Sequence, residues 1–228
     1  MNRFSSLIPA SSLVISCQAY EPNPLRDSTV MALMARAAEM GGAAGIRANG
    51  VDDVAAIAAA VSLPIIGIDK VGGEGVFITP DAETALRLAS AGARIVAIDG
   101  TLRARPNGRT FADEVARIRA ESDVAIMADV DTLESGLAAA SAGADAVATT
   151  LSGYTGARVP VEPDIDLIAA LVARVDIPVV AEGRIRTRAD VAAAVDAGAH
   201  AVVVGTAVTN PLAQTAYLRD ALRPTEGR

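Results

Sequence analysis

The sequence has few of the residues that supply the most versatile chemistry. It contains one cysteine, Cys17, and one histidine, His200, and aromatic residues make up only 3% of the chain, with no tryptophan. A single cysteine cannot form an intramolecular disulfide, which predicts a reduced, cytoplasmic protein. A lone histidine excludes a metal site built from a histidine cluster. We interpret Cys17 as a buried apolar residue at a strand end and His200 as a structural residue.

Long apolar runs and a basic charge balance are also missing. No run of 18 apolar residues occurs, so we expect no membrane-spanning segment. Pro9 interrupts the apolar stretch before Cys17, which leaves too short a core for a secretory signal. The net charge of −7 argues against nucleic-acid binding, because phosphate backbones require a basic face. An anionic ligand must therefore be bound by a local site.

What the chain does contain is a regular alternation of two kinds of segment. Eight short, mostly β-branched runs are typical of strands buried on both faces. They are Leu13–Ser16, Ala44–Arg47, Ile65–Asp69, Ile95–Asp99, Val124–Asp129, Ala146–Thr149, Val179–Glu182 and Ala201–Val204. The segments with helical character are Val30–Met40, Val51–Ala60, Ala82–Ala91, Phe111–Ala120, Leu133–Ala142, Ile165–Val175, Arg188–Ala197 and Pro211–Leu222.

The alternation repeats with a period of two units. Gly42, Gly92, Gly143 and Gly198 stand roughly 50 residues apart, each between a predicted helix and the next strand, where a positive φ is favoured. Strict alternation predicts right-handed βαβ units and a parallel sheet. We therefore predict an α/β fold, a single (β/α)8 TIM barrel that spans residues 1–228 as one domain. An open doubly wound sheet is the alternative.

Polar residues follow the predicted strands at the ends where such barrels carry their chemistry. In strand order they are Gln18, Arg47, Lys70, Asp99, Asp129, Thr150, Glu182 and Gly205. Lys70 ends an apolar strand, where desolvation lowers the pKa of an amine and suits it to be a general base or a Schiff-base nucleophile. A rim lysine that extends into water is the alternative. Glu182 fits an acid–base partner for Lys70, or a structural salt bridge.

Two loops are candidates for phosphate binding. Gly183-Arg184 and Gly205-Thr206 follow the seventh and eighth strands, where barrels of this kind often bind phosphate through backbone N–H groups. The loop after the sixth strand offers hydroxyl groups for a sugar from Thr150, Ser152 and Tyr154.

Two other groups of charged residues have less specific interpretations. Arg103 and Arg105 form a second cationic loop, which we interpret as solvated unless it binds a ligand. Asp99, Asp129 and Glu182 are the only set that suggests a carboxylate site for magnesium.

Distinctive blocks connect these residues with a known family. The most specific blocks are Gly45-Ile46-Arg47-Ala48-Asn49-Gly50 and Thr150-Leu151-Ser152-Gly153-Tyr154. They occur with Ser16-Cys17-Gln18-Ala19, Pro64-Ile65-Ile66-Gly67-Ile68, Phe77-Ile78-Thr79-Pro80, Met127-Ala128-Asp129, Ala181-Glu182-Gly183-Arg184-Ile185 and Val203-Val204-Gly205-Thr206-Ala207. From Ser16 to about Thr209, the chain resembles the bacterial N-acetylmannosamine-6-phosphate 2-epimerase family of amino-sugar and sialic-acid breakdown.

The resemblance implies a ribulose-phosphate-binding type of barrel, often paired as a homodimer, that uses no cofactor and no metal. It implies that Lys70 is the catalytic lysine and Glu182 the active-site glutamate, and that Gln18, Arg47 and Asp129 contact the sugar and its developing oxyanion. It assigns the phosphate to Gly183, Arg184, Gly205 and Thr206. The family usually has Arg-Asp and a longer loop after the lysine, whereas this chain has Val71-Gly72-Gly73-Glu74-Gly75, which bears on loop closure and substrate range.

The implied reaction interconverts N-acetylmannosamine 6-phosphate and N-acetylglucosamine 6-phosphate. In the open-chain sugar, neutral Lys70 removes the C2 proton and Arg47 stabilises the enolate oxygen. A proton then returns to the opposite face, either from Glu182 or through the sugar's own groups. The alternatives are a Schiff-base aldolase that uses Lys70 and a sugar-phosphate sensor without catalytic activity.

Overall fold

Eight parallel strands form a closed barrel in a computed structural model that describes residues 2–156 and 160–222. Each strand pairs with the next along the chain, and β8 pairs with β1 to close the sheet. The strands are β1 Ser12–Cys17, β2 Gly45–Asn49, β3 Ile65–Ile68, β4 Ile95–Asp99, β5 Ala125–Asp129, β6 Ala146–Ala148, β7 Val179–Glu182 and β8 Ala201–Val204. The predicted (β/α)8 fold is confirmed, and the doubly wound alternative is wrong.

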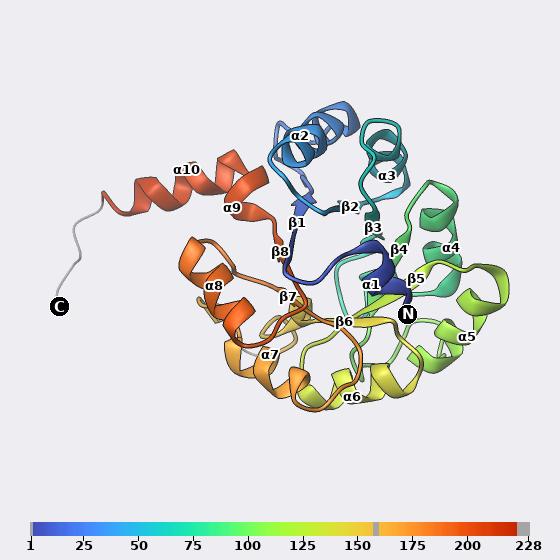
Figure 1. Ribbon diagram of the computed structural model, residues 1–228. Helices are drawn as coiled ribbons and strands as arrows, with labels where there is room; N and C mark the ends of the chain where they lie inside the picture. The colour runs from blue at the N-terminus through green and yellow to red at the C-terminus, as the bar shows by residue number, and fades with distance from the viewer. Residues whose placement is uncertain (1, 157–159, 223–228) are drawn as a thin grey trace.

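Helices surround this barrel, as Figure 1 shows. Those between consecutive strands are α2 Ser28–Met40, α3 Val51–Ala58, α4 Ala82–Ser90, α5 Phe111–Glu121, α6 Leu133–Ser141, α7 Ile165–Val172 and α8 Arg188–Asp196. Three of them, α5, α6 and α8, begin with a threonine capping box. These caps bind backbone N–H groups that the first helical turn leaves without a partner.

The four repeated glycines have the predicted conformation. Gly42, Gly92, Gly143 and Gly198 have φ of 90°, 116°, 94° and 93°. A β-carbon on Gly92 or Gly198 would also lie 2.8 Å from a neighbouring side-chain carbon. Glycine therefore serves the turn that ends each helix, and at Gly92 and Gly198 it also allows close packing against the end of the preceding helix, at Ala58 and Val172.

Successive strand residues alternate between the barrel interior and the layer beneath the helices. In β2, Ile46 and Ala48 belong to the outer apolar layer with the helices, whereas Arg47 between them faces the interior. The interior itself is filled by residues such as Ile66, Ile95 and Met127. This alternation places the strand-end polar groups over an apolar core.

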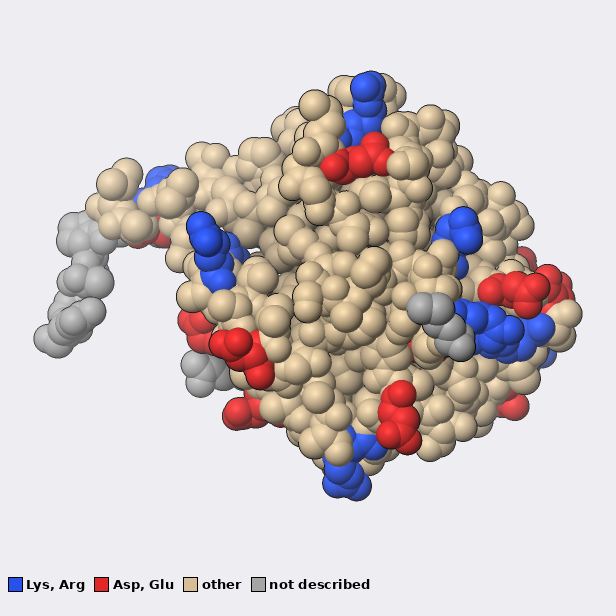
Figure 2. Space-filling view, in the orientation of Figure 1, with Lys and Arg blue, Asp and Glu red and all other residues tan. Residues whose placement is uncertain are grey.

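A short helix that the sequence analysis did not predict covers the N-terminal end of the barrel. Helix α1, Arg3–Leu7, places Phe4 and the following Ile8 against the interior cluster, with both side chains 0% exposed. His200 Nε2 lies 2.9 Å from the Ile8 carbonyl oxygen, and its ring meets Phe4 edge-on at 5.9 Å. Figure 1 shows α1 across this end, and in Figure 2 the centre of the same face is nearly free of charged side chains. The structural interpretation of His200 holds.

The chain after β8 departs from the expected pattern. A four-residue helix, α9 Thr206–Thr209, comes first, and Pro211 then begins α10, Pro211–Asp220. Helix α10 has no buried residue and extends away from the barrel instead of packing beside β8 (Figure 1). The helix was predicted correctly, but its place in the barrel wall was not.

Candidate active site

A pocket of about 450 Å³ opens at the C-terminal ends of the strands. Nine of the twelve predicted site residues line it, contributed by five strand-end loops. They are Gln18, Lys70, Thr150, Tyr154, Glu182, Gly183, Arg184, Gly205 and Thr206. The other three, Arg47, Asp129 and Ser152, are buried below or beside it, with 1%, 0% and 2% of their surface exposed. The structure therefore gathers most of the predicted site at one mouth.

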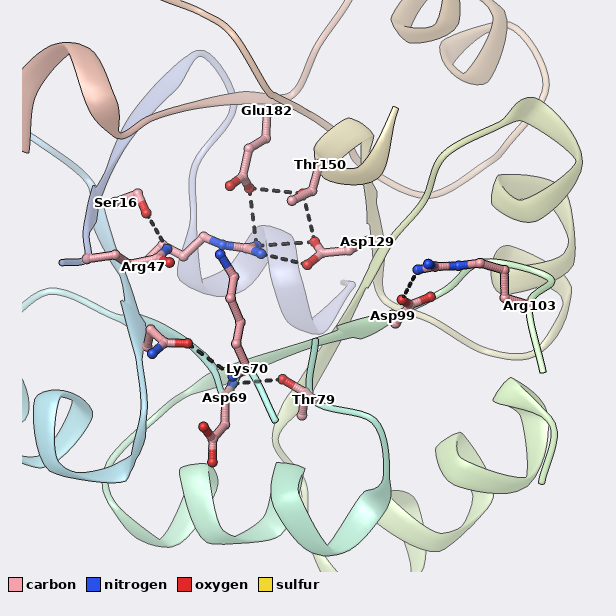
Figure 3. Close-up of polar contacts among 12 residues, drawn as sticks. Ser16, Arg47, Asp69, Lys70, Thr79, Asp99, Arg103, Asp129, Thr150 and Glu182 are labelled. Carbon is pink, nitrogen blue, oxygen red and sulfur yellow. Dashed lines mark hydrogen bonds and ion pairs between the residues drawn. The ribbon is translucent and has the colours of Figure 1, made fainter. Parts of the chain in front are cut away.

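Arg47 is the centre of a buried charged cluster next to the pocket. Its Nη2 lies 2.6 Å from Asp129 Oδ2 and its Nη1 lies 3.2 Å from Asp129 Oδ1, a bidentate pair. The same Nη1 lies 3.2 Å from Glu182 Oε2. Figure 3 shows both carboxylates converging on this one guanidinium. Burial disfavours a charged Arg47, but the two carboxylates outweigh that cost and raise its pKa, so Arg47 remains protonated.

Thr150 links the two carboxylates. Its Oγ1 lies 2.8 Å from Asp129 Oδ1 and 3.1 Å from Glu182 Oε2. A hydroxyl has only one proton to donate, so both contacts are hydrogen bonds only when one carboxyl group carries a proton. Burial, together with the charge of Asp129, raises the pKa of Glu182 to about 6, against the pull of Arg47. Glu182 is therefore the group suited to carry that proton.

Lys70 extends from the end of β3 toward this cluster (Figure 3). It is the only lysine in the sequence. Its backbone N–H donates to Asn49 Oδ1 at 3.1 Å, and it forms an antiparallel bridge with Ile78. Burial and the positive charge of Arg47 lower the pKa of Lys70, while Glu182 and Asp129 partly offset the shift. The amine is thus biased toward its neutral form.

The segment Val71–Gly75 that follows Lys70 forms the loop of a short hairpin, closed by the bridge between Lys70 and Ile78. Val71 N donates to Phe77 O at 2.9 Å, and Thr79 N donates to Asp69 O at 2.7 Å. Thr79 Oγ1 also accepts a hydrogen bond from Asp69 N at 3.0 Å. These bonds fix the base of the hairpin and hold the Lys70 backbone in place.

The loops after β7 and β8 line the pocket with Gly183, Arg184, Arg186, Gly205 and Thr206. Gly183 and Arg184 have φ of 109° and 59°, which turns consecutive peptide groups at the end of β7. The Arg184 guanidinium points elsewhere: Nη1 donates to Ser152 O at 2.6 Å and Nε donates to Glu162 O at 2.7 Å. It also stacks 5.4 Å from the Tyr154 ring. Arg184 therefore holds the loop after β6 against the mouth.

The remaining charged candidates serve the scaffold. Asp99 accepts hydrogen bonds from Thr101 and pairs with Arg103 at 2.6 Å. Arg105 is 6% exposed and donates to the carbonyl oxygens of Pro80 and Asp99, so the prediction of a solvated arginine is wrong for this residue. Among residues 2–156 and 160–222, no group of three or more His, Cys, Asp or Glu side chains is arranged to hold a metal ion.

Tyr20, Arg186 and Asn210 are three of the ten pocket residues that were not predicted from the sequence. Tyr20 and Arg186 lie two positions beyond Gln18 and Arg184, and Asn210 lies just after α9. Tyr20 and Arg186 share the strand-end loops of predicted residues, so their spacing was an available signal. The position of Asn210 depends on the turn from α9 to α10, which was not predicted.

Comparison with known proteins agrees with this geometry. Residues 31–223 match the model of a family described as "Putative N-acetylmannosamine-6-phosphate epimerase". The chain belongs to this family. A relative from Cutibacterium acnes, named "Putative N-acetylmannosamine-6-phosphate 2-epimerase", is 49% identical over 98% of this chain and 100% of its own length. A relative of the same name from Caldanaerobacter subterraneus is 46% identical over 88% of this chain and 86% of its own.

A solved structure shows the same barrel in an epimerase of this family. The N-acetylmannosamine-6-phosphate 2-epimerase from Clostridium perfringens is 40% identical, with a TM-score of 0.91 over 96% of each chain. The resemblance found in the sequence blocks is thereby confirmed across nearly the whole chain. None of the helices in the described part of the chain has the length and apolar character needed to cross a lipid bilayer.

Proposed function

We propose that this chain is an N-acetylmannosamine-6-phosphate 2-epimerase, an isomerase that interconverts its substrate with N-acetylglucosamine 6-phosphate. The observation that carries the proposal is one mouth that holds an amine of lowered pKa and a carboxyl group of raised pKa, Lys70 and Glu182. Groups with their pKa values displaced toward neutrality are suited to exchange protons with a substrate near pH 7. Membership of the epimerase family identifies the carbon concerned as C2 of an N-acyl amino sugar.

The C2 proton becomes acidic when the sugar is in its open-chain form, with an aldehyde at C1. Neutral Lys70 removes this proton, and the electron pair moves onto the C1 oxygen as an enolate. Arg47, held protonated below the floor, favours this negative charge through its field. A proton then adds to the opposite face of C2, and the lysine proton is returned to solvent or sugar. Glu182 in its protonated form supplies the new proton, or it orients the sugar while the sugar's own groups carry it.

The phosphate at C6 is assigned to the turns after β7 and β8. We assign the contacts to the backbone N–H groups of Gly183, Arg184, Gly205 and Thr206, since the Arg184 guanidinium is engaged with the loop after β6. A β-carbon on Gly205 would lie 3.2 Å from Ser16 Cβ, so a larger residue would crowd this end of the pocket. Binding energy from the remote phosphate then holds C2 in place for proton transfer. Gln18, Thr150 and Tyr154 line the part of the pocket left for the sugar.

Proton exchange in heavy water tests the function directly. The wild type should incorporate deuterium at C2 of N-acetylmannosamine 6-phosphate, and Lys70→Arg should lose this exchange by at least ~100-fold, because arginine does not deprotonate. Retention of the fold in the variant is checked by its Tm. Exchange that survives in Lys70→Arg would refute the role of Lys70.

The aldolase alternative is tested on the same protein. Lys70 is the only lysine, so borohydride reduction in the presence of substrate has a single side-chain amine to trap. We expect no adduct at Lys70. An adduct there would favour the Schiff-base mechanism over the enolate mechanism.

We also infer a homodimer in the cytoplasm. Helix α10 exposes Leu212, Tyr217 and Leu218, each more than half accessible, and this apolar surface suits an interface with a second copy. The single, buried cysteine agrees with a reducing compartment. Sedimentation of the full chain and of Leu218→Glu tests the dimer: the wild type should have twice the mass of the variant.

A further inference from the structure

Tyr20 lies between two hollows at the mouth of the barrel. One is the pocket assigned to the substrate, and the other is a neighbouring hollow of about 700 Å³. Tyr20 and Lys70 line both. The second hollow carries an acidic set on its wall, made up of Asp27, Asp52, Asp53 and Asp69. A protonated lysine side chain that turned toward this wall would find carboxylates there and leave the reacting carbon.

The Tyr20 ring holds the amine on the substrate side. Lys70 Nζ lies 4.6 Å from the ring centroid, within the range in which an ammonium is attracted to an aromatic face. The ring also covers the amine, and burial is the main cause that lowers the pKa of Lys70. The ring therefore lies where it fixes the position of the amine at the pocket and adds to its burial.

The Tyr20 hydroxyl has a separate partner. It donates to Gln18 Oε1, and Gln18 Nε2 in turn donates to Ser16 Oγ at 2.6 Å. Burial raises the pKa of the Tyr20 phenol, so it stays a donor at neutral pH. The Gln18 side-chain oxygen accepts from Tyr20, and one of its two N–H groups donates to Ser16. The second N–H is therefore the group that remains to donate to a ligand in the pocket.

We propose that Tyr20 is a positioning residue of the epimerase: its ring keeps the Lys70 amine at the substrate pocket, and its hydroxyl fixes Gln18 as a donor toward the sugar. The proposal rests on the proposed function, in which Lys70 is the base. The ring and the hydroxyl of Tyr20 should therefore affect different kinetic parameters. The ring acts on proton abstraction and therefore on kcat, whereas the hydroxyl acts on sugar binding and therefore on KM.

Two variants separate the ring from the hydroxyl. Tyr20→Phe keeps the ring and removes the hydroxyl, so kcat should stay within about twofold of the wild type while KM rises severalfold. Tyr20→Leu removes both, so kcat should fall about tenfold as well. Phe111→Leu is the matched control, since Phe111 lies beneath the Arg105 guanidinium at 5.6 Å but outside the mouth. It should leave both parameters unchanged.

Titration of Lys70 gives a second readout that does not depend on turnover. Because the chain has one lysine, an amine-specific acylating reagent followed by mass spectrometry of the Lys70 peptide reports the ionisation of this side chain alone. The charged and titratable groups around it are Arg47, Asp129, Glu182, Tyr20, Arg184 and Arg186 at the pocket, and Arg26, Asp27, Asp52, Asp53 and Asp69 in the second hollow. In Tyr20→Leu the amine becomes accessible to water and to the carboxylates of the second hollow, so its pKa should rise toward the ordinary lysine value. In Tyr20→Phe the pKa should remain as in the wild type.

The outcomes separate failure of the inference from failure of the function. If the wild type exchanges the C2 proton but Tyr20→Leu matches it in kcat and in Lys70 titration, the inference is overturned. If Tyr20→Phe loses kcat as severely as Tyr20→Leu, the division between ring and hydroxyl is overturned. If the wild type catalyses no exchange at all, the proposed function fails, while the Lys70 titration still decides whether the ring holds the amine.

Discussion

Arg47 and Glu182 are ion-paired, with Nη1 and Oε2 3.2 Å apart, yet the pKa of Glu182 is raised to about 6. The main cause is burial of the carboxyl group, and the charge of Asp129, which already occupies the same guanidinium with two hydrogen bonds, adds to it. Two carboxylates on one buried cation leave a net negative charge, and protonation of one of them removes it. Burial and Asp129 thereby make Glu182 a proton carrier, while Arg47 holds it as an ion-pair partner.

The difference in unfolding free energy between Glu182→Gln and the wild type should shift in favour of the variant as the pH rises. A carboxyl group with a folded pKa above its unfolded value stabilises the fold below the unfolded pKa, about 4.5, and loses this contribution as the pH passes through about 6. Glutamine does not titrate. Relative to the wild type, Glu182→Gln should therefore gain about 1–2 kcal/mol between pH 4 and pH 7 in urea unfolding. Glu121→Gln, exposed at the end of α5, is the control, and a pH-independent difference would contradict the prediction.

Arg47→Met should be among the most destabilising single changes in the chain. Methionine fills much of the same space but leaves Asp129, which is 0% exposed, without its cation. Removal of one partner from a buried pair costs about 3–5 kcal/mol. The double variant Arg47→Met, Asp129→Asn should recover a large part of this loss, because the uncompensated charge is gone. Equilibrium unfolding of both variants measures the coupling, and strict additivity of the two changes would refute it.

The sequence was sufficient to predict the barrel because its signals are local and repeated. Every predicted strand overlaps an observed one within two residues at either end, since short, continuous β-branched runs are typical of strands buried on both faces. The location of the candidate site could be predicted from the same pattern. Residues just after parallel strands, such as Lys70 and Glu182, lie at one end of a closed barrel, however far apart they are in the chain.

What could not be predicted depends on side-chain direction and on contacts between distant segments. Arg184 was assigned to the phosphate from its position, but its guanidinium binds the carbonyl oxygens of Ser152 and Glu162 in the loop after β6. Helix α1 is too short to show a helical period, and its role follows from contact with His200, which lies near the other end of the sequence. Neither feature leaves a local signature.

Phe4→Ala should destabilise the barrel while leaving catalysis intact. Phe4 is 0% exposed within the interior cluster at the N-terminal end, on the side opposite the mouth. Truncation of a buried phenylalanine costs about 3–5 kcal/mol. The free energy of unfolding should fall by that amount, whereas kcat and KM below the transition temperature should match the wild type. A variant of normal stability would show that α1 is not part of the core.

Arg184 offers a test of whether charge or loop position binds the phosphorylated sugar. Arg184→Ala removes two hydrogen bonds to the loop after β6, so KM should rise about tenfold with kcat little changed. Arg184→Lys should not restore KM, because an ammonium lacks the planar fork that reaches two carbonyl oxygens. The loop contributes to sugar binding whether or not the sugar is phosphorylated, so the KM of unphosphorylated N-acetylmannosamine should rise by a similar factor. If instead lysine restores KM, and only the phosphorylated substrate is affected, the guanidinium turns to the phosphate in the complex and the loop is held by other contacts.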